Sequence, residues 1–300
     1  MAQSSKRWIL GIVAIVLLCL VCIGGTGAGL GYLTLRPKTL ASDGGVELVL
    51  RTEADARDAA LEVVVRRIDE MEGARGATVV AQGDDKIVVQ VPGTTDSQAL
   101  TAVLSRGGSL QFLPVSSAAY TFDLTQQGER FRNEREAAGE TVTDAQVDAF
   151  LASQLLGELS LHWSARIDDV TGLRVRDQAY ALHPDARLTG EMIGDASVGY
   201  DQFNMPYVAL EFDDLGAEAF CSLTGDLAGS DLAIVLDGEV LSAPRVIEPI
   251  CGGRAQITLG SGGSADQLLR EAQDLALTLR AGALPAPVTI ESVSVVSPTG

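Results

Sequence analysis

An apolar stretch near the N-terminus constrains the fold of this chain more than any other feature. No charged residue occurs from Trp8 to Leu33, and about 20 such residues in a helix are enough to cross the hydrocarbon core of a bilayer. Two basic residues precede the stretch, Lys6 and Arg7, and two follow it, Arg36 and Lys38. Because these flanking charges balance, the positive-inside rule alone does not orient the segment.

The segments around this stretch predict a single-pass membrane protein. The short N-terminus and the large acidic remainder favour a cytoplasmic N-terminus (1–7), a transmembrane helix (8–33), a linker (34–43) and a large domain on the far side of the membrane. A cleaved signal peptide is the alternative, because Thr26-Gly27-Ala28 offers small residues for cleavage. The apolar core of such a peptide is only about 7–15 residues long, which makes cleavage the weaker interpretation.

Alternating glycines occupy the second half of the stretch. The pairs Gly25/Gly29 and Gly27/Gly31 have the small-xxx-small spacing of a helix-packing face. The general tolerance of membrane helices for glycine explains them equally well. No predicted strand precedes them, so they do not indicate a dinucleotide-binding loop.

The remainder of the chain is strongly acidic. Residues 41–300 carry all 40 acidic residues and 18 of the 22 basic ones, a formal net charge of −22. The negative electrostatic potential of such a surface repels the nucleic-acid backbone, so we expect no nucleic-acid partner. The simpler interpretation of the charge is a surface that keeps the domain soluble.

No sequence motif indicates catalysis, a cofactor or a metal. The chain contains no Walker loop, no Gly-x-Ser-x-Gly motif and no Cys–His constellation. Its two histidines, His162 and His183, are far apart and make a weak metal signal. Asp237 and Ser242 share one predicted hairpin, but no histidine lies near them in sequence. We therefore expect a protein that is not an enzyme and that has neither cofactor nor metal.

Residues 44–115 have the element order of a ferredoxin-like α/β plait. The pattern predicts a strand over 45–51, a helix, a hairpin over 77–91, a helix over about 97–105 and a strand over 110–115. The first helix is expected to start at a capping box, Thr52-x-x-Asp55. Its apolar face shares helical spacing and comprises Leu61, Val64, Val65, Ile68 and Met71.

The middle of the chain, 116–187, reads as a packed helical insertion. Residues 129–140 are charged and helical in pattern, and Thr143-x-x-Gln146 predicts a capped second helix. An exposed linker is the alternative. The stretch around His162 is expected to be a half-buried strand.

Residues 188–282 predict a second unit of the same class. A strand over 207–212 leads into a helix after Asp213, and the last helix begins at the capping box Ser264-x-x-Gln267. Between them, Asp237-Gly238 is the dipeptide best suited to a two-residue hairpin turn. Pro244 ends the second hairpin strand, since proline is tolerated only at an edge or strand end. A further strand follows from Arg254.

Several stretches of both units resemble the SecD family, whose members assist preprotein translocation across the bacterial inner membrane. In the first unit the similar stretches are 44–50, 65–70 and 82–93. In the second unit they are 188–190, 208–212, 216–220, 233–244, 248–250, 252–257 and 279–287. Asp237, Gly238, Ser242, Pro244 and Arg254 belong to the most family-specific of these motifs.

The resemblance implies an α+β fold with two ferredoxin-like plaits and a helical insertion. The transmembrane helix would be followed by a base (44–115 with 283–300), a connector (116–187) and a head (188–282). Residues 286–296 would return as a strand into the base sheet.

The resemblance also implies an inner-membrane accessory factor of Sec-dependent export whose bulk is periplasmic. Its partners would be secretory preproteins, a SecY-type translocon, a SecF-like subunit and the lipid bilayer. The other interpretation is a membrane-anchored interaction or structural ectodomain that is not involved in export.

The chain departs from the family pattern in two respects. It has no second apolar run, so we expect either a truncated product or a stand-alone paralogue without the proton-conducting helices. It also has Cys251 where the family pattern has proline, and Cys221 lies in the same unit. In an oxidising periplasm two such cysteines often pair, so we expect a disulfide. Two buried free thiols are the alternative, and Cα atoms more than about 7 Å apart would exclude the bond.

Overall fold

The computed structural model describes residues 39–298 except 95, 169 and 260–263. The predicted transmembrane helix over 8–33 and its glycine face (Gly25, Gly27, Gly29 and Gly31) lie outside the described residues. No helix in the described part of the chain is long and apolar enough to cross a membrane. The described part mixes helices with three sheets, which confirms the α+β class.

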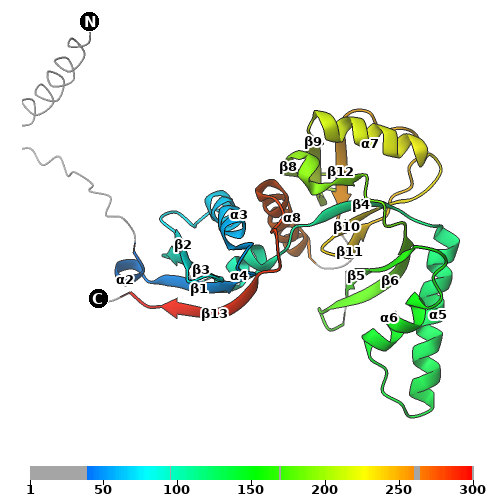
Figure 1. The fold of residues 1–300 in the computed structure, drawn as a ribbon, viewed down its shortest axis with the longest axis horizontal. Coiled ribbons are helices and arrows are strands. Elements are labelled where there is room, and N and C mark those ends of the chain that lie inside the picture. The colour runs from blue at the N-terminus through cyan, green and yellow to red at the C-terminus, as the bar shows by residue number, and fades with distance from the viewer. Residues whose placement is uncertain (1–38, 95, 169, 260–263, 299–300) are drawn as a thin grey trace, which may run out of the picture. The chain divides into compact units, whose positions relative to one another are not determined.

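The first sheet joins the two ends of the described chain (Figure 1). Its antiparallel strands lie in the order β13 (Thr289–Val296), β1 (Gly45–Arg51), β3 (Lys86–Pro92) and β2 (Thr78–Gln82). The helices α3 (Arg57–Glu70) and α4 (Ser97–Ser105) share one apolar core with these strands. The short helix α2 (Leu40–Asp43) precedes β1. We call this unit the base.

The fourth strand of the base is not the one that the first unit's pattern predicts. The strand β4 (Leu110–Pro114) was expected to complete the base sheet, but it pairs with β10 (Leu232–Leu236) and β7 (Leu188–Thr189) in another sheet. The strand β13 pairs with β1 instead. The reason is its apolar content. Leu110 and Phe112 enter one core while Leu113 enters another, and a strand that is apolar on both faces belongs inside a sheet that is covered on both sides.

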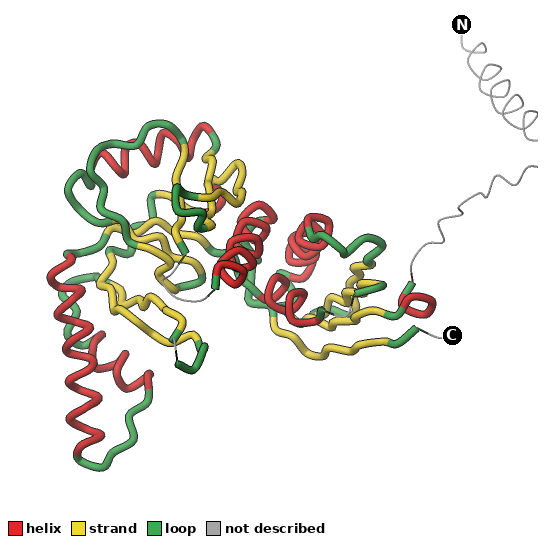
Figure 2. The backbone as a smooth tube through the Cα atoms, turned by 180° about the vertical axis from the view of Figure 1, so that it is seen from behind, coloured by secondary structure: helices red, strands yellow, loops and turns green. Residues whose placement is uncertain are grey.

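That other sheet has six strands. Their order is β6 (Arg174–Leu182), β5 (Ser160–Ile167), β11 (Glu239–Ser242), β10 (Leu232–Leu236), β4 and β7 (Leu188–Thr189). The helices α5 (Ala118–Ala137) and α6 (Asp144–Ala152) pack beside β6 and β5 (Figure 2). The insertion is therefore not purely helical, because it contributes two strands, and β5 pairs in parallel with β11.

A three-stranded sheet in the order β12 (Arg254–Thr258), β9 (Pro206–Phe212) and β8 (Ile193–Tyr200) completes the fold. A 3₁₀ turn, η1 (Gly190–Met192), leads into it. Together with α7 (Asp214–Asp226), α8 (Ala265–Ala281) and one face of the six-stranded sheet, it encloses a single apolar core. We call the part of the chain from β4 to α8 the head.

The strands of 188–282 thus lie in two sheets instead of one plait. All five residues of β10 are buried, so this strand needs cover on both faces and neighbours on both sides. The strand β9 instead alternates between buried side chains and half-buried or exposed ones, which suits a sheet with one covered face.

Two of the three predicted capping boxes are confirmed, at Thr143/Gln146 and Ser264/Gln267. The third is wrong, since α3 begins after Ala56 without a side-chain cap. The Thr52 hydroxyl instead donates to the Pro287 carbonyl (3.2 Å), which ties the end of β1 to the returning C-terminal segment.

Candidate functional site

A cleft of about 820 Å³ opens in the head. Its walls come from β9, β12, α7, β10 and the segment 244–250. Its floor is apolar and is made of core side chains, namely Phe112, Leu210, Phe220, Leu232 and Ile234. Charged side chains line it as well, namely Asp195, Glu211, Arg245, Glu248 and Arg254. An apolar floor with a few polar groups is the usual construction of a binding site.

The cleft passes around the edge of the three-stranded sheet. Ala209 and Gln256 stand opposite each other on the outer face of this sheet, and both line the cleft. Leu210 and Ala255 stand on the inner face, and they line it as well. The strand β12 is an edge strand of this sheet, and residues on both of its faces, Ala255 and Gln256, line the cleft.

The edge of β12 inside the cleft carries unpaired backbone groups. In an antiparallel ladder successive residues point their backbone groups alternately toward and away from the partner strand. The Phe212 N–H donates to the Gly253 carbonyl, so Arg254, Gln256 and Thr258 direct their N–H and C=O groups away from β9. Among the described residues no strand pairs with that side of β12.

The segment 244–250 forms the opposite wall. Its first part is held by backbone bonds, because the Pro244 carbonyl accepts from Leu232 N–H and the Val246 N–H donates to the Ser230 carbonyl. Beyond Val246 the segment is exposed, and Ile247 has 86% of its surface in solvent. Ile250 is 40% exposed. This wall therefore presents two large apolar side chains, of which Ile247 packs on little of the protein.

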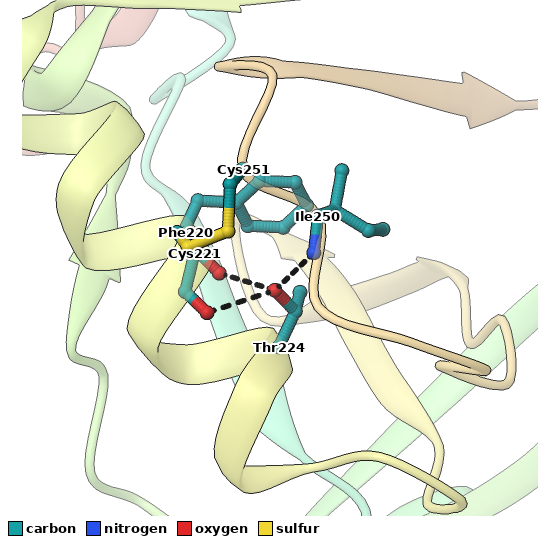
Figure 3. The surroundings of a disulfide bond; sticks show 5 residues. All are labelled: Phe220, Cys221, Thr224, Ile250 and Cys251. Carbon is teal, nitrogen blue, oxygen red and sulfur yellow. Dashed lines mark hydrogen bonds between the residues drawn. A yellow bond between two sulfur atoms is a disulfide. The ribbon is translucent and has the colours of Figure 1, made fainter.

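A disulfide joins this wall to the floor. Cys221 on α7 is bonded to Cys251, with Cα atoms 4.4 Å apart. Beside it, the Thr224 hydroxyl accepts from the Ile250 N–H (2.9 Å) and donates to the Phe220 carbonyl (2.6 Å; Figure 3). Phe220, Thr224 and Ile250 all line the cleft.

The structure separates the motif residues of the 232–257 stretch. Pro244 and Arg254 line the cleft, and Arg254 pairs with Glu211 at 2.8 Å. Gly238 accepts a hydrogen bond from the His162 ring at its carbonyl, outside the cleft. The Ser242 hydroxyl is buried without a hydrogen-bond partner among the described residues.

Asp237 forms the tight turn with Gly238, and both have positive φ, 50° and 85°. Its carboxylate turns away from the cleft and accepts from the N–H groups of Gly108 (3.1 Å) and Ser109 (2.9 Å). This motif residue therefore acts where the chain passes from the base into the head.

The helical pattern predicts the wrong environment for one residue at that passage, Arg67. Arg67 lies outside the apolar face that the helical spacing predicts, but the structure buries it completely. Its guanidinium donates to the carbonyls of Val103, Arg106, Gly107 and Gly282. Burial lowers the pKa of Arg67 to about 10, an effect that Asp237 opposes. The signal was present in the spacing, because position 67 falls on the same face as the buried positions 60, 63 and 64.

No group of three or more His, Cys, Asp or Glu side chains suited to a metal ion occurs in the described part of the chain. His162 lies in β5, half-buried, beside Ser160 and the Gly238 carbonyl.

Comparisons with known proteins point to one family. Residues 168–286 match the family model described as "SecDF, P1 head subdomain", and residues 57–117 match "Protein translocase subunit SecDF, P1 domain, N-terminal". Protein translocase subunit SecD of Calditerrivibrio nitroreducens is 34% identical over 276 residues, which cover 89% of this chain and 47% of that protein. The SecD of Desulfurispirillum indicum is also 34% identical, over 80% of this chain and 40% of that protein.

Solved structures agree with the sequence comparisons. The structure described as "Structure and function of a membrane component SecDF that enhances protein export" matches with a TM-score of 0.55 and 27% identity, over 82% of this chain and 98% of that chain. "Crystal structure of SecDF in Super-membrane-facing form" shares the fold at a TM-score of 0.56 and 24% identity, over 96% of this chain and 34% of that chain. The chain spans less than half the length of the curated relatives it matches.

Proposed function

Because the chain belongs to the SecD family, through the P1 domain that these comparisons share, we propose that it is an accessory factor of Sec-dependent protein export. Its ligand is an unfolded segment of a secretory preprotein. The cleft of the head binds that segment, and no chemical step is catalysed.

The observation that carries this proposal is the combination of two features in one cleft. The apolar floor and the exposed Ile247 offer burial to apolar side chains. The edge of β12 that pairs with no other described strand offers hydrogen bonds to an extended backbone. An unfolded chain satisfies both, because strand addition to a sheet edge uses main-chain bonds for affinity and side-chain pockets for selectivity.

The remaining parts of the proposal follow from the family. The segment 8–33 anchors the protein in the bacterial inner membrane, with the described domain in the periplasm. A SecY-type translocon and a SecF-like subunit are its partners there. The sequence holds no acidic residue in this segment, so the segment by itself offers no carboxylate for a proton relay.

Site-specific photocrosslinking tests the proposal. A photoreactive residue replaces Ile247 in the cleft wall, and another replaces Leu173, which is 65% exposed in the turn between β5 and β6. A stalled secretory chain is expected to crosslink at position 247 and not at position 173. Equal labelling at both positions, or none at 247, contradicts the proposed site.

Affinity purification from membranes tests the wider assignment. Recovery of translocon subunits supports a role in export. Recovery of this chain alone, or of an unrelated envelope complex, favours the interaction ectodomain that the sequence leaves as the alternative.

A further inference from the structure

We infer that the Cys221–Cys251 disulfide is a covalent clasp that positions one wall of the cleft, so that affinity for an extended apolar segment falls when the disulfide is reduced. The ligand in this inference rests on the proposed function. The clasp itself rests only on the contacts of the loop between Val246 and Gly253.

That loop has few other attachments. Its ends are fixed, because Val246 bonds to residues 229 and 230 and the Gly253 carbonyl accepts from Phe212. Between these ends a single hydrogen bond, from Ile250 N–H to the Thr224 hydroxyl, joins the loop to the rest of the described chain. Residues 247–252 are all exposed, so packing contributes little. The disulfide is therefore the main constraint on the position of this loop.

The clasp acts directly on the cleft. On the loop side, Ile250 directly precedes Cys251, and both Ile247 and Ile250 line the wall. On the helix side, Phe220 precedes Cys221 and lies in the floor. The bond consequently fixes the distance between wall and floor, and a preorganised wall lowers the ordering cost of binding.

The exposure of the bond makes it responsive to thiols. Cys251 is exposed while Cys221 is half-buried. A thiolate of a dithiol reductant attacks the Cys251 sulfur, the protein disulfide breaks, and Cys221 leaves as a thiolate that takes up a proton. The second thiol of the reductant then closes its own disulfide and releases Cys251 as a thiol. The protein gains two electrons and two protons, and the reductant is oxidised to a cyclic disulfide.

The test uses the full chain in detergent with two readouts. Hydrogen–deuterium exchange follows the amides of the loop, and fluorescence anisotropy follows a labelled ten-residue peptide of alternating valine and serine. Reduction, or the variant Cys221→Ser/Cys251→Ser, is expected to speed exchange of the hydrogen-bonded Ile250 amide and to weaken peptide binding about tenfold. The control Cys19→Ser/Cys22→Ser keeps the clasp and is expected to respond to reductant as the wild type does.

The outcomes separate the clasp from the proposed function. Unchanged exchange at Ile250 after reduction overturns the clasp whatever the peptide does. Faster exchange with unchanged affinity overturns its role in binding. If the oxidised wild type does not bind the peptide, the proposed function is contradicted, and so is the predicted effect of reduction on affinity. The exchange data then still show whether the disulfide positions the loop.

Discussion

Arg67 and Asp237 form hydrogen bonds to the two sides of the same peptide unit, between Gly107 and Gly108. Arg67, on a helix of the base, donates to the Gly107 carbonyl, and Asp237, in the hairpin turn of the head, accepts from the Gly108 N–H. This bend is where the chain first passes from base to head. Arg67 also donates to Gly282 at the return passage, and the Leu284 N–H donates to the Gly107 carbonyl (2.7 Å). Two residues that are 170 positions apart in the numbering thus organise both passages.

Replacing Arg67 should destabilise the folded chain more than the loss of a surface charge would. Arg67→Met leaves four carbonyls without their charged donor, and bonds to charged groups contribute about 1.5–3 kcal/mol each. Removing the buried charge relieves part of its desolvation cost, which has the opposite sign. We expect a net loss of about 3 kcal/mol in the free energy of unfolding, measured by chemical denaturation.

Arg130→Met is the matched control for Arg67. Arg130 lies on α5 with 62% of its side chain exposed and meets Asp123 only at 3.8 Å. Its loss should change stability by less than about 0.5 kcal/mol. Arg67→Lys should behave like Arg67→Met, because an ammonium lacks the planar fork that reaches several carbonyls at once.

Asp237→Gly should weaken the same passage from the head side. Glycine keeps the positive φ of this position, so the change isolates the carboxylate and its two backbone bonds. We expect a loss of about 1–2 kcal/mol. In a double-mutant cycle with Arg67→Met the two effects should not add, and strict additivity would show that the two residues act independently.

Reduction should also lower the stability of the head. The disulfide closes a loop with a sequence separation of 30, for which the chain-entropy account gives roughly 3–4 kcal/mol. Denaturation of oxidised and reduced protein measures the difference. The variant Cys19→Ser/Cys22→Ser should lose as much stability on reduction as the wild type does. The variant Cys221→Ser/Cys251→Ser should be less stable than the oxidised wild type by the same amount, which would identify the bond responsible.

Main-chain binding at β12 predicts a directional effect of amide methylation. In an extended peptide of alternating valine and serine, the amides of one residue type point to β12 and those of the other point away. The apolar floor fixes which face the valines take, and so fixes the register. N-methylation of one set should weaken binding by about tenfold, while methylation of the other set should have little effect. Equal effects of both sets would exclude strand addition.

The base should lose stability in acid through Glu291. This side chain on β13 accepts from Lys86 on β3 (2.8 Å) and faces Arg51 on β1 at 3.6 Å. The hydrogen bond from Lys86 lowers the pKa of Glu291 below its usual value. A carboxylate with a lowered folded-state pKa stabilises the fold above its unfolded-state pKa of about 4.3, and that contribution is lost as the pH falls through the folded value.

Melting temperatures at pH 5 and pH 3 measure this effect. Glu291→Gln should have a lower melting temperature than the wild type at pH 5. Its melting temperature should then fall less than that of the wild type between pH 5 and pH 3. Glu218→Gln, at an exposed position on α7, is the matched control and should follow the wild type. Identical acid profiles for the wild type and Glu291→Gln would contradict the assignment.

Local sequence was sufficient for features whose determinants lie within a few residues. The turn at Asp237-Gly238 needs only two residues that tolerate positive φ. The caps at Thr143 and Ser264 need only a partner three positions on. Helix α4 falls where its pattern predicts it, over Ser97–Ser105. The resemblance to the SecD family, read from short motifs, is confirmed by the comparisons.

Tertiary structure decided what depends on partners far away in the chain. The pattern of β4 predicts a strand but not its neighbours. Only the assembled core shows that β4 pairs with β10 and not with the base sheet. Arg67 has the same residue type as its exposed neighbours, and its burial depends on four carbonyls that other segments bring to it. Within the described part of the chain β12 has only β9 as a neighbour, and its other edge borders the cleft. Pairing between distant strands is set by the burial of complementary faces, which periodicity within one segment does not encode.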